Sequence, residues 1–177
     1  MSESCFVIAA IRGEESLLSA CKSKSPIIFD LEPNIETVEQ NAMLCREYGK
    51  TYFVHMDLAE GIGKDKFGLR FVKKMGVNGI ISTRANLIKL AKDMGLKTVQ
   101  RIFVLDSQSL KTAESVLKTC PDMVEIMPGI IPVAIEELSS VVNIPIIAGG
   151  LIRDKNDVEK ISKAGAVAVS TSNSELW

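Results

Sequence analysis

The sequence lacks paired cysteines, long apolar runs and a leader-like N-terminus. Its cysteines form no Cys-X-X-Cys pair, and His55 is the only histidine, so we expect no metal site, no disulfide framework and reduced core thiols. The longest apolar stretches, 129–135 and 144–147, contain or adjoin proline or glycine and fall far short of the roughly 18–20 residues of a membrane span. No basic segment precedes the first apolar run. We therefore expect a soluble cytoplasmic protein with no membrane partner.

Aromatic residues are also scarce, at 5%, and no RNP- or KH-like motif is present, which excludes the common RNA-binding modules. What the sequence does contain is an uneven distribution of charge. The net charge is −1 for the whole chain, yet residues 64–111 carry 11 basic and 3 acidic side chains. A strongly basic middle in a near-neutral protein points to a polyanionic partner.

Short β-branched runs alternate with amphipathic segments along all 177 residues, which we take as one domain, 1–177. The expected strands are 6–11, 26–30, 51–57, 79–83, 98–106, 123–127, 144–148 and 166–171, and the expected helices are 14–22, 35–48, 66–75, 87–94, 110–118, 132–141 and 155–163. This order predicts an α/β fold of parallel βαβ units. Eight strands favour a closed (β/α)8 barrel of the TIM type, although such barrels usually exceed about 200 residues. An open doubly wound sheet is the alternative.

The clearest site signal lies at the ends of the last two expected strands. The pair Gly149-Gly150 follows the seventh strand, and Ser170-Thr171-Ser172 closes the eighth. In such barrels the loops after strands 7 and 8 bind phosphate, together with the N-terminus of a short extra helix, for which residues 173–177 leave room. We expect a phosphate at Gly149, Gly150, Ser170, Thr171 and Ser172. The alternative is a pair of glycine-eased turns without a ligand.

Other polar strand ends are candidates for binding the hydroxyl groups of a small polyol. They are Asp30, His55, Asp57, Asp106 and Glu125, with Arg12 or Arg84 adding positive charge. The alternation of a strand would project His55 and Asp57 to the same side. Carboxylates in such positions suit acid–base catalysis as readily as ligand binding, so this chemistry leaves a phosphate-ligand enzyme and a phosphate-ligand sensor both open.

The basic middle concentrates in two expected helices. In segment 66–75 cations recur at helical spacing beside a face formed by Phe67, Phe71 and Met75, which we expect to pack on the barrel. The candidate RNA-binding residues are Lys66, Arg70, Lys73, Lys74, Lys89 and Lys92. A merely solvated helix face is the alternative, but it would predict interspersed acids, and only Asp65 and Asp93 accompany these cations.

Six segments add a more specific signal. They are VHMDL at 54–58, NGIISTRANL at 78–87, TVQR at 98–101, EIMPGIIP at 125–132, PIIAGGLI at 145–152, and AVSTSN at 168–173 before the final Leu176-Trp177. In this order, over nearly the whole chain, they closely resemble the glycerol uptake operon antiterminators. These are small mRNA-binding regulators that respond to glycerol 3-phosphate.

The resemblance implies a compact TIM-type barrel with no catalytic residues and no cofactor. It implies that glycerol 3-phosphate is the effector, and that the partner is the leader mRNA of a glycerol-utilisation operon, where binding prevents transcription termination. The runner-up is a TIM-barrel isomerase or epimerase that acts on a small phosphorylated sugar or polyol. Short expected loops favour the regulator, because they leave little chain for a lid that excludes water.

Overall fold

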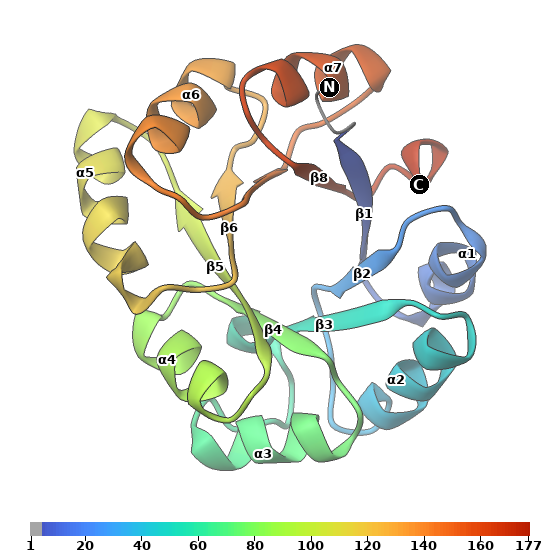
Figure 1. Cartoon of the computed structure of the whole chain (residues 1–177). Helices are drawn as coiled ribbons and strands as arrows, with labels where there is room; N and C mark the ends of the chain where they lie inside the picture. Colours follow the sequence, from blue (N-terminus) through green and yellow to red (C-terminus); the bar gives the residue numbers. More distant parts are fainter. Residues whose placement is uncertain (1–4) are drawn as a thin grey trace.

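The computed structural model describes residues 5–177, and its eight parallel strands close into a barrel in chain order (Figure 1). The strands are β1 (Phe6–Ile11), β2 (Ile27–Asp30), β3 (Thr51–His55), β4 (Gly79–Ser82), β5 (Lys97–Phe103), β6 (Met123–Met127), β7 (Ile146–Gly149) and β8 (Ala168–Thr171). Strand β1 pairs with both β2 and β8, which closes the ring. The closed barrel is confirmed, and the open sheet is excluded.

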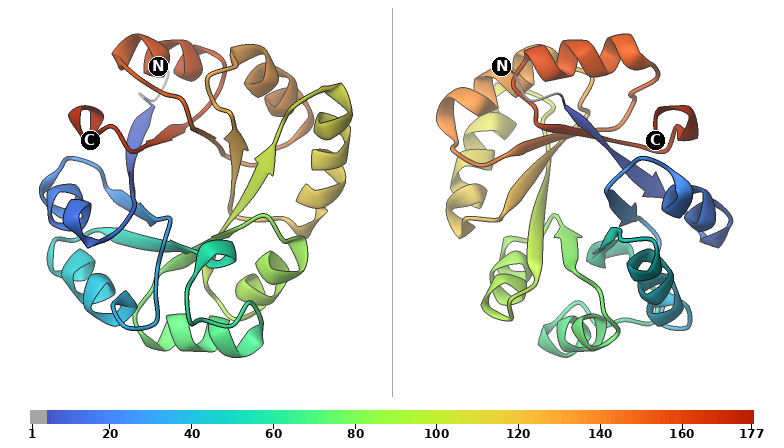
Figure 2. Two further views of the ribbon diagram at one scale, coloured as in Figure 1. Left: turned by 180° about the vertical axis from the view of Figure 1, so that it is seen from behind. Right: turned by 45° about the vertical axis from the view of Figure 1, so that its right-hand side comes forward.

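Helices follow the strands and surround the barrel (Figure 2). They are α1 (Leu17–Lys22), α2 (Val38–Glu47), α3 (Lys66–Lys74), α4 (Ala85–Asp93), α5 (Ser107–Val116), α6 (Pro132–Val141) and α7 (Lys155–Lys163), with 3₁₀ turns η1 (Glu14–Ser16), η2 (Met56–Leu58), η3 (Leu117–Thr119) and η4 (Ser174–Leu176). In the described part of the chain, the short turn η4 takes the place of an eighth helix after β8. None of the helices in residues 5–177 is long and apolar enough to cross a membrane.

Side-chain alternation along the strands builds two apolar layers. The inner one fills the barrel around Phe29 and Phe53, whose rings meet edge to face with centroids 5.5 Å apart. The outer one lies between strands and helices and includes Ile28 and Tyr52. Residues two apart on a strand point to the same face. The last inward-facing residue of each strand is therefore in line with the inner apolar layer. These positions carry the polar side chains of the candidate site.

Several strands are shorter than predicted, and two of these differences matter for the site. Strand β3 ends at His55, and Asp57 lies in η2. The prediction that strand alternation points these two side chains to the same side was therefore wrong. Strand β5 ends at Phe103 rather than at 106, and Asp106 instead caps α5 by accepting a hydrogen bond from the Ser109 amide at 2.7 Å. Asp106 stabilises the start of the helix that follows it, and Asp57 accepts hydrogen bonds from Ser82 and Thr83 at the end of the next strand. Strand patterning does not distinguish such polar residues from a strand end.

Helix α3 begins at Asp65, whose carboxylate accepts hydrogen bonds from the amides of Phe67 and Gly68. The helix packs inward through Leu69 and Val72. The expected apolar face was partly wrong, because Phe71 and Met75 are only half-buried against the core and Phe67 is 64% exposed.

Candidate functional site

A cavity of about 410 Å³ opens at the C-terminal ends of the strands. Its lining comes from the ends of β1, β2, β5, β6, β7 and β8 and from the loops that follow them: Ala10, Arg12, Leu31, Arg101, Glu125, Met127, Gly150, Leu151, Ile152, Arg153, Ser170, Thr171, Ser172 and Asn173. This is the end at which barrels of this architecture place their sites. The volume suits a small ligand.

The loops after β7 and β8 form one wall of this cavity, as predicted, and bring together Gly150, Ser170, Thr171 and Ser172. Gly150 has φ +83°, a left-handed backbone conformation that glycine adopts at little cost. The expected short helical turn is present as η4, and the side chain of Asn173 caps it by accepting from the Glu175 amide at 3.1 Å.

This wall is tied to the chain end. The Trp177 indole Nε1–H donates to the Thr171 carbonyl at 2.8 Å, and the Asn173 side-chain amide donates to the Arg153 carbonyl at 2.8 Å. The Trp177 bond ties the segment after β8 to the chain end, and the Asn173 bond joins that segment to the loop after β7. Backbone amides, hydroxyls and a guanidinium therefore face a common space.

Gly149 is not part of the cavity lining but sets the spacing behind it. A Cβ at this position would lie 2.6 Å from Glu125 Oε1 and 2.7 Å from Ser170 Oγ, both closer than real contacts allow. The absence of a side chain lets these two groups meet, and the Ser170 hydroxyl donates to Glu125 at 2.5 Å. The predicted role of Gly149 thus changes from a direct ligand contact to a positional one.

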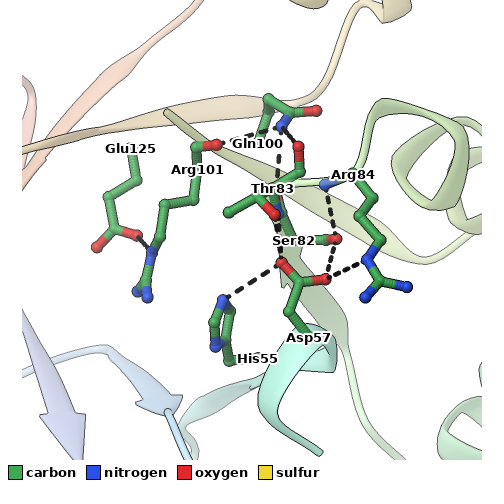
Figure 3. A network of polar contacts seen from close by, with 8 residues as sticks. All are labelled: His55, Asp57, Ser82, Thr83, Arg84, Gln100, Arg101 and Glu125. Atoms are coloured by element: carbon green, nitrogen blue, oxygen red, sulfur yellow. Dashed lines mark hydrogen bonds and ion pairs between the residues drawn. The ribbon is translucent and has the colours of Figure 1, made fainter. Parts of the chain in front are cut away.

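An ion pair forms the floor of the cavity. The Arg101 Nε–H donates to Glu125 Oε2 at 2.6 Å, and both side chains are almost completely buried (Figure 3). A buried arginine–carboxylate pair persists where further hydrogen bonds complete it, as Ser170 does here. The remaining guanidinium nitrogens of Arg101 offer donors beyond the bond to Glu125.

Sequence reasoning missed Arg101 and Arg153 as site residues. Arg101 was taken as mid-strand because β5 was expected to continue to 106. The sequence did offer one signal: Arg101 is a charged residue two positions after Val99, so it points to the same inner face of an otherwise apolar strand. Arg153 lies three residues after Gly150 and lines the same wall. With Arg12, which pairs with Glu32 at the rim, three arginines surround the space.

His55 lies just below this floor, 4% exposed and on the inward parity of β3. Neither ring nitrogen has a hydrogen-bond partner among the described residues, and Nε2 is 3.7 Å from Asp57 Oδ2, too long for a hydrogen bond. Burial and the nearby Arg101 and Arg12 charges lower the pKa of His55 to about 4, against the opposing effect of Asp57. At neutral pH His55 is therefore an uncharged imidazole.

Asp57 does not line the cavity but organises the start of α4. It accepts hydrogen bonds of 2.7 Å from the Ser82 hydroxyl and from the Thr83 amide and hydroxyl, and Arg84 Nε lies 3.7 Å away (Figure 3). Partial burial opposes ionisation, but the hydrogen bonds from Thr83 and Ser82 lower the pKa of Asp57 below its usual value. Arg84 is half-exposed and also stands outside the cavity lining.

Two predicted polyol ligands lie elsewhere. Asp30 faces the outer layer, where it accepts a 2.5 Å hydrogen bond from the Tyr52 hydroxyl, and burial raises its pKa. The next residue, Leu31, points to the opposite face and lines the cavity. Asp106 is exposed and caps α5. Of the predicted polyol set, the structure brings Arg12 and Glu125 into the cavity lining, with His55 beneath it.

The six predicted RNA-binding cations all lie exposed on α3 and α4. The Lys73 ammonium donates to the Met94 carbonyl, which links the two helices, and the Lys92 ammonium donates to the Cys120 carbonyl. The cations therefore face outward as expected, although α3 docks on the barrel through Leu69 and Val72 rather than through Phe67. Whether these cations contact RNA stays a prediction.

In residues 5–177, no group of three or more histidine, cysteine or acidic side chains is arranged to hold a metal ion. The polar groups of the cavity are instead arginine, hydroxyl and backbone amide groups around one carboxylate. Such donors suit an anionic ligand that carries oxygen acceptors.

Comparison with known proteins gives a consistent result. A family model described as glycerol-3-phosphate responsive antiterminator matches residues 7–177. The uncharacterized protein YgcP of Escherichia coli is 35% identical over 173 residues, which cover 97% of this chain and 91% of that protein.

Two solved structures share both fold and sequence with the chain. The glycerol uptake operon antiterminator regulatory protein from Listeria monocytogenes superposes with a TM-score of 0.91 at 31% identity, over 97% of this chain and 94% of that one. A glycerol uptake operon antiterminator-related protein from Thermotoga maritima gives 0.87 at 29% identity, over 98% of each chain. Aldolases and a phosphorylated-sugar epimerase, at 11–15% identity, share the barrel fold alone.

Proposed function

Because the chain belongs to the glycerol-3-phosphate responsive antiterminator family, we propose that it binds glycerol 3-phosphate and, in response, the leader mRNA of a glycerol-utilisation operon, where it prevents transcription termination. The observation that carries this proposal is the cavity between the β7 and β8 loops, with three arginines around it. We place the protein in the cytoplasm, acting in glycerol metabolism without a cofactor.

The phosphate would occupy the wall formed by Gly150, Ser170, Thr171 and Ser172, with Gly149 setting the spacing behind them. Arg153 lies on this wall and supplies a charge-assisted donor. Hydroxyl and amide donors held in fixed loops bind phosphate with little reorganisation. Here the two loops are hydrogen-bonded to each other, and the one after β8 is also bonded to Trp177.

The glycerol hydroxyls would meet the floor of the cavity. Arg101 has free donors for an oxygen, and Glu125 has acceptor capacity beyond the bonds from Arg101 and Ser170. His55, uncharged at neutral pH, lies close enough to this pair for Arg101 to shift its pKa. Asp30, Asp57, Asp106 and Arg84 are left out of the proposed ligand set, since their contacts lie elsewhere.

The RNA would bind to the cationic surface that we define as Lys66, Arg70, Lys73, Lys74, Lys89 and Lys92. Binding would rest on phosphate contacts and counterion release. The surface lies on the outside of the barrel and the ligand cavity at one end, so activation requires that the ligand prefer the RNA-competent state.

A row of neighbouring polar groups offers one electrostatic connection between the cavity and the cationic surface. Arg101 faces the ligand cavity, His55 lies between Arg101 and Asp57, and Asp57 holds Ser82 and Thr83 at the start of α4 (Figure 3). A ligand that draws Arg101 away from Glu125 would change the electrostatic surroundings of His55 and Asp57. Coupling of this kind is reciprocal, so RNA must raise the affinity for ligand by the same factor.

An enzyme of the isomerase or epimerase class remains the alternative. Family membership favours a regulator, and the candidate acid–base group Glu125 is committed to two hydrogen bonds with Arg101 and Ser170. We propose that the protein has no catalytic activity. Incubation with phosphorylated sugars, followed by NMR, would show turnover if the alternative were true.

Filter binding of leader RNA with and without glycerol 3-phosphate tests the proposal, with glycerol and inorganic phosphate as control ligands. Trp177, the single tryptophan, is bonded to Thr171 in the phosphate wall and gives a fluorescence signal for ligand binding. We expect RNA affinity to rise only with glycerol 3-phosphate. Equal RNA binding under all conditions would overturn the proposed response to ligand.

A further inference from the structure

Phe67 is an aromatic side chain that α3 presents to solvent, 64% exposed. Its ring is flanked by two cations of the same helix: the Lys66 ammonium lies 5.0 Å from the ring centroid, and the Arg70 guanidinium carbon lies 6.0 Å from it. Since Leu69 and Val72 already dock the helix, Phe67 contributes little to the core. An exposed ring beside two cations has the chemistry of a nucleotide contact.

A basic groove lies on the neighbouring part of the same outer surface. A cavity of about 360 Å³ between α4 and η3 is lined by three lysines, Lys89, Lys92 and Lys118, together with Asp93 and Thr119. Helix α3 packs beside α4, and α4 beside η3, as the order around the barrel shows (Figure 1). Lys118 was not among the cations singled out from the sequence.

We propose that this outer surface binds single-stranded RNA, with an unpaired base stacked on Phe67 and the backbone phosphates crossing α4 toward the groove of Lys89, Lys92 and Lys118. The inference rests on the proposed RNA binding and specifies which form of RNA is recognised and by which residues.

The chemistry favours a single strand over a duplex. Single-strand sites combine an aromatic platform, which accepts any base face, with a positive groove that follows the backbone. In a duplex the bases are stacked on one another and inaccessible to a side chain on a convex helix surface. Lys66 and Arg70 lie close enough to Phe67 to contact the phosphates next to a base stacked there, once that base displaces them from over the ring.

Fluorescence anisotropy with labelled oligouridylate of about 12 nucleotides tests this, at saturating glycerol 3-phosphate, against a duplex RNA of equal length. We expect Phe67→Ala to weaken single-strand binding about 5- to 150-fold, with the salt dependence unchanged, because stacking releases no counterions. Phe67→Trp should restore binding. Lys118→Ala should instead flatten the slope of log affinity against log salt by about 0.7.

Two control variants carry comparable changes on the other side of the barrel. Val133→Ala removes an exposed apolar side chain from α6, and Lys155→Ala removes an exposed cation from α7. Both should bind RNA like the parent. Because Phe67 is exposed, its replacement should leave the fold intact, which circular dichroism checks.

The outcomes separate this inference from the proposed function. If the parent binds oligouridylate and Phe67→Ala binds it equally well, the stacking site is refuted while RNA binding stands. Equal affinity for the duplex refutes the preference for a single strand. If the parent binds neither oligouridylate nor leader RNA, the proposed function fails, and this inference fails with it.

Discussion

Replacing Gly149 by alanine tests how the floor of the ligand cavity is held. The new methyl group would lie 2.6 Å from Glu125 Oε1 and 2.7 Å from Ser170 Oγ. Glu125 cannot move aside cheaply, because its carboxylate is 1% exposed and bound to Arg101 at 2.6 Å. The clash should break the 2.5 Å bond from Ser170 to Glu125.

The magnitude follows from two costs. Overpacking a filled core costs about 1–3 kcal/mol. Loss of a hydrogen bond to a buried carboxylate costs about 1.5–3 kcal/mol. Allowing for partial relaxation, we expect Gly149→Ala to lower the free energy of unfolding by about 2–4 kcal/mol and to weaken glycerol 3-phosphate binding, because Glu125 and Ser170 both line the cavity.

Urea denaturation followed by circular dichroism measures the stability, and calorimetry measures the ligand affinity. A double-mutant cycle with Ser170→Ala isolates the cause, since that variant removes the hydroxyl that the methyl group would strike. The cost of Gly149→Ala should then fall by about 1 kcal/mol. A Gly149→Ala protein that unfolds at the same urea concentration as the parent would refute the close packing of this floor.

Three further predictions concern the ligand, the RNA and pH. Ser172→Glu should abolish glycerol 3-phosphate binding in calorimetry, because it adds a like charge to the phosphate wall; unchanged affinity would place the phosphate elsewhere. Joint replacement of Arg70, Lys73 and Lys74 by alanine should weaken leader RNA binding and reduce the slope of log affinity against log salt concentration by about 2. The affinity for glycerol 3-phosphate in the absence of RNA should be nearly unchanged. If the triple variant binds RNA like the parent at every salt concentration, these cations form only a solvated surface. The folded-state pKa of His55, about 4, lies below its ordinary value of 6.5, so the unfolded state takes up the proton first and stability should fall by up to about 3 kcal/mol as pH drops from 6.5 to 4. His55→Gln should remove that part of the pH dependence in urea titrations, and an identical profile would contradict the burial of a neutral imidazole.

Much of the fold follows from local sequence. Alternating β-branched runs and amphipathic segments place the strands and helices in order, and parallel βαβ units of this number close into a barrel. The cavity wall formed by the β7 and β8 loops was also predictable, because Gly150 and Ser170–Ser172 lie at strand ends whose position in such a barrel is set by topology. The exposed cations of α3 and α4 follow from helical periodicity in the same way.

The floor of the site depended on tertiary structure. Asp30 was expected to face the cavity, but strand alternation turns it to the outer layer and Leu31 inward. Asp106 was expected at the end of β5, but the strand ends three residues earlier and Asp106 caps α5. A strand end and a helix cap have the same polar signature in sequence. Arg101 was overlooked for the same reason of strand length. Its pairing with Glu125, and the pairing of Glu125 with Ser170, join three strands across the barrel. Local patterns carry no information about such contacts. The register of β5 on β6 sets Arg101 opposite Glu125, and the pairing of β6 and β8 with β7 brings Ser170 to Glu125 across Gly149.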